Sequence, residues 1–478
     1  MSLARKMLRA QQKQVHRVVR EATGLVVLGE QLQRQGALYH ALRCHYAAMQ
    51  QLGEGFLLHP AGKRACFLSA LAAYQLRIYD EAVLLMEAAR GADWENATVH
   101  YNLGMLYGAA RRPADAADAY RVALALDPTM VAAENNLGNT LRELGDLEGA
   151  ARCYERITAR DPEDAAARYN LAHVVLLNGD LARGFHLYES RWEVDAWVAE
   201  YGRRDITSPR LQPGAPGQHV LVHQEQGVGD TLQFLRYLHA LWRLGYRITF
   251  EAPVELGRWL RAIERPGLAV ITKGEPIPAH DAHIPLLSIP AFLGTATEAD
   301  IPPALDVPVR VPSPLWTAPG DMRPVIGFAW AGNPNHHADH HRSAPIEQLA
   351  PLFALSGRRF VSLQVGARAV ELYGALPRIP LGEGSEILDV SAGLREFEST
   401  AALVRACDAV VTVDTSMAHL GGLLGVPTFV LTSWLSEWRW QLGRTDSPWY
   451  PSVRLVRQPT LGDWPSTATE AARLIEAL

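Results

Sequence analysis

The chain has 478 residues, enough for about two to four domains, and 48% of them are hydrophobic, which allows more than one buried core. Its net charge of −5 argues against a nucleic-acid-binding protein held by a broad basic surface. No apolar run approaches the roughly 18 residues that a membrane-spanning helix needs.

The N-terminus and the cysteines point to a cytoplasmic protein. The first residues are basic, but no sustained apolar segment follows them, so we expect no secretory signal. The four cysteines are scattered and share no metal-ligand spacing, and we expect them to be reduced and buried.

A period of 34 residues runs through the N-terminal part of the chain. Asn-Leu-Gly at 102–104 recurs at 136–138 and, as Asn-Leu-Ala, at 170–172, and Tyr120, Tyr154 and Tyr188 keep the same interval. Small residues at this spacing let two helices of a unit approach closely. The pattern resembles tetratricopeptide repeats over residues 63–192, whereas residues 1–62 predict a helical cap or a degenerate repeat.

Stacked helix pairs of this kind form an α-solenoid with an extended concave face. We expect that face to bind a polypeptide or to mediate self-association. Asn102, Asn136 and Asn170 are the candidate peptide-binding residues. Each of them could equally lie at a helix–helix contact or face water, but as a set they favour peptide binding.

After a junction and linker at 193–217, strands and helices alternate, which predicts parallel sheets. The first set of expected strands is 220–223, 247–251 and 269–272, and a Pro-rich passage at 301–324 follows it. The second set is 325–330, 360–364, 387–390, 409–413 and 428–431. We expect two Rossmann-like lobes facing across a cleft, at 218–311 and 312–478, so the fold class is α followed by α/β.

The first strand of this part leads into Gln226-Gly227-Val228-Gly229-Asp230. Two glycines let the backbone turn tightly and come close to a bound group, and Asp230 would stand near the start of a helix. An isolated Gly-x-Gly is more often a simple strand-to-helix turn, and Asp230 would then be a helix cap.

A second such junction follows the buried strand 409–413 and reads Asp414-Thr415-Ser416-Met417-Ala418-His419. A helix N-terminus favours an anionic group, and ligands of open α/β sheets lie beyond the carboxyl ends of the strands. Thr415, Ser416 and His419 could therefore hold a pyrophosphate. The alternative is an ordinary N-cap by Asp414 or Thr415.

Together the two motifs resemble the paired signatures of the ADP-heptose heptosyltransferase family. The resemblance runs from about residue 218 to the C-terminus and includes Trp-Ala-Gly-Asn-Pro at 330–334, Arg-Ser at 342–343 and Asp-Ser-Pro-Trp-Tyr-Pro at 446–451. It implies a GT-B pair of Rossmann-like domains, with a nucleotide-sugar donor in the C-terminal lobe and the acceptor nearer the N-terminal lobe.

The resemblance also implies roles for single residues. Asp230 would be the general base that takes the proton of the acceptor hydroxyl. Thr415, Ser416 and His419 would hold the leaving diphosphate, with Asp414 orienting the loop or touching the sugar. For His419 the alternative is a buried histidine bonded to a carbonyl.

Further candidates lie in three loops. Asn333 and Gln364 each stand at a strand end, where they could bond a sugar or base edge or cap a turn. Gln226, Gly227 and Gly229 would contribute to a phosphate or acceptor loop.

The loop 336–342 holds four histidines, an aspartate and Arg342. Its spacing fits no structural zinc pattern, and the resembled fold generally works without a metal, so we expect neither a metal nor another cofactor. We expect His341 or Arg342 to contact a phosphate or the acceptor, and a solvated loop is the second reading. The heptosyltransferases place a lysine near this region, and its absence here argues against ADP-heptose as the donor.

Three hypotheses follow for the whole chain. The first is a protein glycosyltransferase, whose repeats recruit a polypeptide and whose lobes transfer a sugar to Ser or Thr; this design resembles the protein O-linked N-acetylglucosamine transferases and repeat-containing flagellin-modifying enzymes, so flagellin is a candidate acceptor. The second is an enzyme of the lipopolysaccharide core. The third is a non-catalytic scaffold with an inactive transferase fold. The sequence leaves the donor sugar, the acceptor and the oligomeric state open.

Overall fold

The computed structural model describes residues 3–202, 206–214, 216–313, 320–335 and 339–478. The chain forms two compact units, which divide after Leu171. This point lies within helix α9 (Ala165–Leu177), so the end of the last predicted helix pair belongs to the C-terminal unit.

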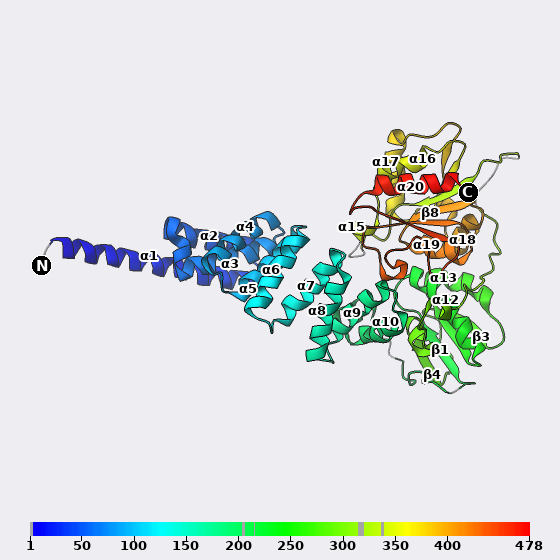
Figure 1. Ribbon diagram of the computed structural model, residues 1–478, viewed down its shortest axis with the longest axis horizontal. Helices are drawn as coiled ribbons and strands as arrows, with labels where there is room; N and C mark the ends of the chain where they lie inside the picture. Colours follow the sequence, from blue (N-terminus) through cyan, green and yellow to red (C-terminus); the bar gives the residue numbers. More distant parts are fainter. Residues whose placement is uncertain (1–2, 203–205, 215, 314–319, 336–338) are drawn as a thin grey trace. The chain divides into compact units, whose positions relative to one another are not determined.

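The N-terminal unit consists of helices that pack against their neighbours along the chain (Figure 1). They are α1 (Leu3–Arg34), α2 (Leu38–Leu52), α3 (Pro60–Gln75), α4 (Tyr79–Ala92), α5 (Ala97–Ala109), α6 (Pro113–Leu126), α7 (Val131–Glu143), α8 (Leu147–Arg160) and the first part of α9. Glycines allow the close approach that the period predicts: a methyl group on Gly104 would lie 2.5 Å from the Tyr120 ring, and one on Gly138 would lie 2.7 Å from the Tyr154 ring.

The C-terminal unit begins with the remaining helical segments and a parallel sheet. Helices α10 (Leu181–Tyr188) and α11 (Asp195–Tyr201) precede the sheet. Its strands are β1 (His219–His223), β2 (Arg247–Ala252), β3 (Leu268–Thr272) and β4 (Ala282–Pro285), in the spatial order β3-β2-β1-β4. Helix α12 (Val228–Arg243) connects β1 to β2, and α13 (Val254–Leu260) lies between β2 and β3 in the chain. Helix α14 (Ile289–Leu293) follows β4. The strand order reverses direction between β1 and β4.

A second parallel sheet follows, with the spatial order β10-β9-β8-β5-β6-β7. Its strands are β5 (Val325–Ala329), β6 (Arg359–Ser362), β7 (Glu386–Asp389), β8 (Ala409–Val413), β9 (Thr428–Thr432) and β10 (Val453–Arg457). The intervening helices are α15 (Asp339–Arg342), α16 (Ala350–Phe353), α17 (Glu371–Ala375), α18 (Phe397–Arg405) and α19 (Ser416–Leu423), and α20 (Trp464–Glu476) closes the unit. Here the order reverses between β8 and β5.

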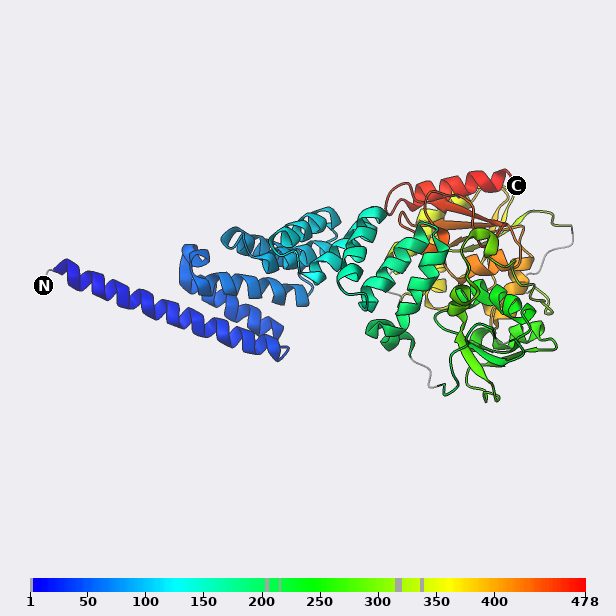
Figure 2. The same cartoon turned by 60° about the horizontal axis from the view of Figure 1, so that its bottom comes forward.

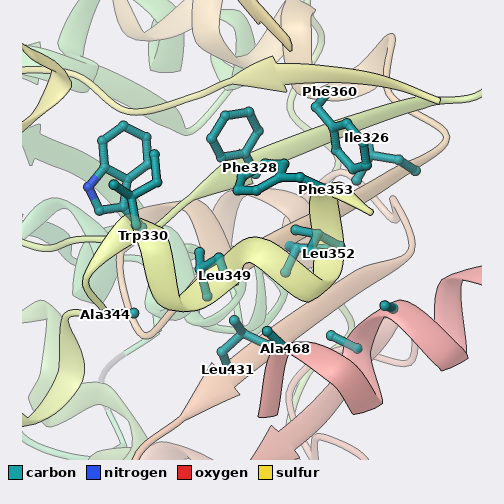
Figure 3. Close-up of a cluster of buried hydrophobic side chains, with 14 of the residues drawn as sticks. Ile326, Phe328, Trp330, Ala344, Leu349, Leu352, Phe353, Phe360, Leu431 and Ala468 are labelled. Carbon is teal, nitrogen blue, oxygen red and sulfur yellow. The ribbon is translucent and has the colours of Figure 1, made fainter. Parts of the chain in front are cut away.

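The strands of the second sheet are continuous apolar runs in the sequence because they contribute to a buried hydrophobic core. Phe328 stacks on Trp330 at a centroid distance of 5.8 Å and meets the Phe353 ring edge-to-face at 5.0 Å. Leu431 of β9 and Ala468 of α20 belong to the same buried cluster (Figure 3). The parallel sheets predicted for this part of the chain are confirmed, although β4 and β10 were missed.

Candidate active site

The segment between β1 and α12 forms a tight turn that ends in a helix cap. Gln226 adopts a φ of +60°, and Gly227 follows as the N-cap residue of α12. The Gly227 amide donates a hydrogen bond of 2.9 Å to Oδ2 of Asp230. Asp230 therefore uses one carboxylate oxygen to cap its own helix. A helix cap is the role that the sequence indicated as the alternative to a general base.

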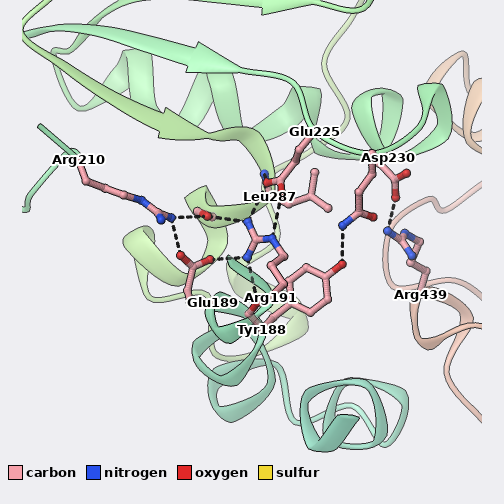
Figure 4. A network of polar contacts seen from close by, with 10 residues as sticks. Tyr188, Glu189, Arg191, Arg210, Glu225, Asp230, Leu287 and Arg439 are labelled. Atoms are coloured by element: carbon pink, nitrogen blue, oxygen red, sulfur yellow. Dashed lines mark hydrogen bonds and ion pairs between the residues drawn. The ribbon is translucent and has the colours of Figure 1, made fainter. Parts of the chain in front are cut away.

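The other oxygen of Asp230 accepts a hydrogen bond from an arginine in the connection between β9 and β10 of the second sheet. Arg439 lies on the short turn Trp438–Trp440 and donates from Nη2 to Oδ1 of Asp230. Its Nη1 lies 2.7 Å from Glu437, and its guanidinium lies 4.4 Å from the centre of the Trp438 ring. Burial alone would lower the pKa of Arg439, but the carboxylates of Asp230 and Glu437 outweigh burial and raise it. A permanently charged group thus links the two sheet domains at the predicted base (Figure 4).

The first turns of α12 and α19 lie against each other. A methyl group on Gly229 would come 3.0 Å from Cδ2 of His419 and 3.5 Å from Cα of Ser416. Thr415 is the N-cap residue of α19, and its Oγ1 accepts the amide N–H two residues on, at 3.3 Å. The positive ends of two helices therefore converge beyond β1 and β8, an arrangement that favours an anionic ligand.

His419 lies in the contact between the two lobes and is only 4% exposed. Its ring stacks on Trp440 at a centroid distance of 5.1 Å, and its Nδ1 lies 3.3 Å from Oη of Tyr450. Burial, together with the charges of Arg439 and Arg236, lowers the pKa of His419 well below its usual value. The imidazole is therefore neutral at neutral pH, and it can offer a hydrogen bond but no positive charge.

Asp414 directly follows the carboxyl end of β8, next to the reversal in strand order. Burial raises the pKa of its carboxyl, against the lowering effect of Arg342 and Arg439. Arg342, the last residue of α15, packs on the loop after β5, since a methyl group on Gly332 would lie 3.0 Å from its Nε. Asp414 directly follows β8 and Arg342 packs on the loop after β5, so the charge of Arg342 acts on Asp414 at the switch point between these two strands.

Two other predicted donor-binding residues have local roles in the loops that carry them. Gln364 is buried, accepts hydrogen bonds from the amides of Trp330 and Ala331 at 3.2 and 3.0 Å, and donates one to the Ala331 carbonyl at 3.0 Å. Asn333 is exposed and caps a turn by accepting the Asn335 amide at 3.0 Å. Their contacts with a donor stay predictions.

Only part of the histidine-rich loop is described, since His336 and His337 lie outside the described residues. His340 and His341 have ring centroids 3.9 Å apart. The buried carboxylate of Asp339 instead organises this loop: it accepts from Ser343 at 2.6 Å and lies 2.5 Å from Nη2 of Arg368. The expectations that the site works without a metal and that His341 contacts a phosphate are untested.

A buried ion pair holds the turn after β1 from the opposite side. Arg191, just beyond α10, is fully buried and donates to Glu225 from Nε and Nη2, at 2.9 and 2.8 Å. Glu225 also accepts the Leu287 amide at 2.9 Å, next to the end of β4 (Figure 4). Oη of Tyr188, the last residue of α10, accepts a 2.7 Å hydrogen bond from Gln226. The switch point of the first sheet is therefore fixed by residues that belong to the repeat region.

The asparagines predicted to bind a peptide make contacts along the helices of the N-terminal unit. Asn102 is buried and donates to the Thr98 carbonyl of its own helix at 2.8 Å. Asn136 lies 3.5 Å from Oη of Tyr101, and Asn170 donates to Asn135 at 2.9 Å. Asn136 and Asn170 thus connect adjacent repeats, and peptide binding by this set stays a prediction.

Comparison with known proteins identifies the repeats. Two family models of the tetratricopeptide repeat match residues 97–130 and 135–197. The chain is 30% identical to Protein FlbA of Caulobacter vibrioides over 154 residues, which are 31% of this chain and 24% of FlbA. It therefore matches about a quarter of the length of that relative.

Solved structures of repeat proteins also match. YrrB, described as a TPR protein with an unusual peptide-binding site, is 19% identical, with 39% of this chain and 92% of YrrB covered and a TM-score of 0.33. PilW, a type IV pilus biogenesis factor, is 25% identical, with 36% and 78% covered and a TM-score of 0.31. MamA from Desulfovibrio magneticus RS-1 is 15% identical, with 38% and 96% covered and a TM-score of 0.33.

Proposed function

We propose that this tetratricopeptide-repeat protein is a glycosyltransferase that moves a sugar from a nucleotide-sugar to a Ser or Thr hydroxyl of a polypeptide. The observation that carries the proposal is the meeting of α12 and α19, where Gly229 lies against Ser416 and His419. Each helix starts beyond a strand next to a reversal in strand order, which is where open α/β sheets bind ligands.

The residues around this contact suit a diphosphate. Amide N–H groups in the first turn of α19 and the hydroxyl of Ser416 would bind anionic oxygens, while the Thr415 hydroxyl caps the Met417 amide and bonds Thr412. Arg342 and Arg439 supply positive charge at the same edge, as their effect on the pKa of Asp414 indicates. Neutral His419 can donate a hydrogen bond without adding charge. Together these groups would stabilise the charge that develops on a leaving nucleoside diphosphate.

The transfer step needs one proton acceptor. The acceptor oxygen attacks the anomeric carbon, the bond from that carbon to the phosphate oxygen breaks, and the hydroxyl proton passes to a carboxylate. Asp230 is our candidate, and in the structure its carboxylate pairs with Arg439. A diphosphate that takes Arg439 as its counter-ion would release Asp230 for the acceptor hydroxyl. Donor binding would thereby prepare the base.

The proposed polypeptide acceptor rests on the repeats. Stacked helix pairs offer an extended surface suited to a peptide segment. The last of these helices is also built into the site, since Tyr188 bonds Gln226 and Arg191 pairs with Glu225, both immediately before the α12 cap. The last repeat helix, α10, and the candidate base are thus joined through a few hydrogen bonds within the C-terminal unit.

Calorimetric titration of the full chain with a panel of nucleoside diphosphates tests the donor site. We expect one of them to bind, and we expect Arg439→Gln to weaken that binding about tenfold or more, since a lost charge-assisted hydrogen bond costs about 1.5–3 kcal/mol. The matched control is Arg473→Gln on the exposed side of α20, which should leave binding unchanged. Absence of binding by every member of the panel would contradict the proposal.

A scaffold without catalysis is the second candidate, and one observation favours it. Both carboxylate oxygens of Asp230 have partners that stabilise the fold, Gly227 and Arg439. If Asp230→Asn leaves the modification of every co-purifying protein unchanged while removal of the repeats abolishes complex formation, the scaffold is correct. A lipopolysaccharide-core enzyme would instead reveal itself by an altered core in cells that lack the chain.

A further inference from the structure

The N-terminal half of α1 is a helical segment that the rest of its unit does not cover. In both views it extends past the helices that follow it (Figures 1 and 2). Further along the same helix, Ala22 and Val26 are buried where α1 packs on α2 and α3. By contrast, Met7, Leu8 and Val15 are 66%, 57% and 54% exposed. The buried stripe of α1 thus continues towards the N-terminus as an exposed apolar stripe.

The two faces of this segment differ sharply in chemistry. At 100° per residue, the apolar side chains fall on one side of the helix, and they are Met7, Leu8, Val15, Val18 and Val19. The opposite side carries the basic residues Arg5, Lys6, Arg9, Lys13, Arg17 and Arg20. The first acidic residue of the chain is Glu21, so the segment has a uniform positive charge.

We propose that residues 5–20 form an amphipathic helix that docks the protein on an anionic lipid surface. A basic face beside a modest apolar stripe is the pattern of helices that lie in a membrane interface, where headgroup phosphates meet the cations and the acyl boundary meets the apolar side. Gln14 borders the apolar stripe and Gln11 lies within it, between Val18 and Val15, so the hydrophobicity of the stripe is low. Among the described residues, no helix combines the length and the apolar character of a membrane span.

The positive charge of this segment, together with its apolar stripe, favours an anionic lipid surface over a second copy of the chain or a nucleic acid. A second copy of the segment would bring together two sets of basic side chains without a single carboxylate between residues 5 and 20. A nucleic acid would satisfy the basic face and leave Leu8 and Val15 in water. An anionic bilayer satisfies both faces at once.

Vesicle co-sedimentation of the full chain tests the proposal. The chain should sediment with vesicles of mixed phosphatidylcholine and phosphatidylglycerol, should remain in solution with phosphatidylcholine alone, and should be released by high salt. Replacing Leu8 and Val15 by Gln, or Lys6, Arg9 and Lys13 by Gln, should each reduce the bound fraction about tenfold or more.

The controls lie on the same unit and share the chemistry of the test variants. Leu84→Gln, at a side chain of α4 that is 71% exposed, and Arg43→Gln, on the exposed side of α2, should bind vesicles like the natural chain. Equal sedimentation with neutral vesicles, or unchanged binding in both test variants, would overturn the proposal. So would sedimentation equilibrium showing a dimer that the Leu8 and Val15 variant dissociates, since the occupant would then be a second copy.

Discussion

Replacing Arg191 by Met should strongly destabilise the C-terminal unit. The Glu225 carboxylate would keep the Leu287 amide and lose both hydrogen bonds from the guanidinium. Removing one partner of a buried ion pair costs about 3–5 kcal/mol, because the remaining charge has no compensation. Burial already raises the pKa of Glu225, against the opposing effect of Arg191, so the variant should raise it further.

The sign of the pH dependence follows from this shift. In the variant, the pKa of Glu225 is higher in the folded chain than in the unfolded chain, where it lies near the ordinary 4.5. The folded state therefore binds the proton more tightly, and the loss of stability should grow as the pH rises above 4.5 towards the folded pKa. Replacing Glu225 by Leu in the same chain removes the buried charge and should recover much of the loss.

Hydrogen exchange followed by mass spectrometry in increasing urea is the suitable assay, because the two compact units need not unfold together. Peptides from β1 report the C-terminal unit, and peptides from α5 and α6 report the N-terminal unit. The control is Arg473→Met, which removes an ion pair whose side chains are 64% and 47% exposed and should leave both sets of peptides unchanged. If Arg191→Met behaves like this control, or if the double variant is no more stable than the single one, the reasoning is wrong.

Three further substitutions test other contacts. Gly229→Ala should cost the C-terminal unit about 1–3 kcal/mol by pressing a methyl group on His419, whereas Gly374→Ala, whose methyl group would meet open space, should not destabilise it in urea unfolding. The pKa of His419 is lowered in the folded chain, so the folded chain should lose up to about 1.4 kcal/mol of stability per pH unit as the pH falls below 6.5. His419→Asn removes this titrating group and should make the fall of stability below pH 6.5 less steep. Equal slopes of stability against pH in the two chains would refute this role. In the N-terminal unit, Gly138→Ala should cost about 1–3 kcal/mol and Gly108→Ala should not; equal exchange protection in both would refute close repeat packing.

The regular parts of the fold could be predicted because they depend on local pattern. The 34-residue period placed the repeat helices, and continuous apolar runs placed most strands of the two sheets. Strand β4 (Ala282–Pro285) includes His283 and ends in a proline, which argues against a strand, and β10 has exposed Arg454 within it. Neither strand could be distinguished from a loop by composition.

The candidate site was harder to predict, because its contacts join distant parts of the chain. The sequence marked Gly229, Asp230 and His419, which lie near one another in the structure. It did not mark Arg439, whose only signal was its place between two tryptophans, and it did not mark Arg191. A buried charge is recognisable only when its partner is known, and these partners lie 209 and 34 residues away along the chain.

Intact-mass measurement of the proteins that co-purify with this chain tests the proposed sugar transfer most directly. The comparison is between cells that carry the natural chain and cells that carry Asp230→Asn, after hydrogen exchange has shown that the variant is folded. We predict that at least one co-purifying protein carries a sugar-sized mass increment with the natural chain and loses it with the variant. Identical masses in the two sets of cells would contradict a transferase in which Asp230 is the base.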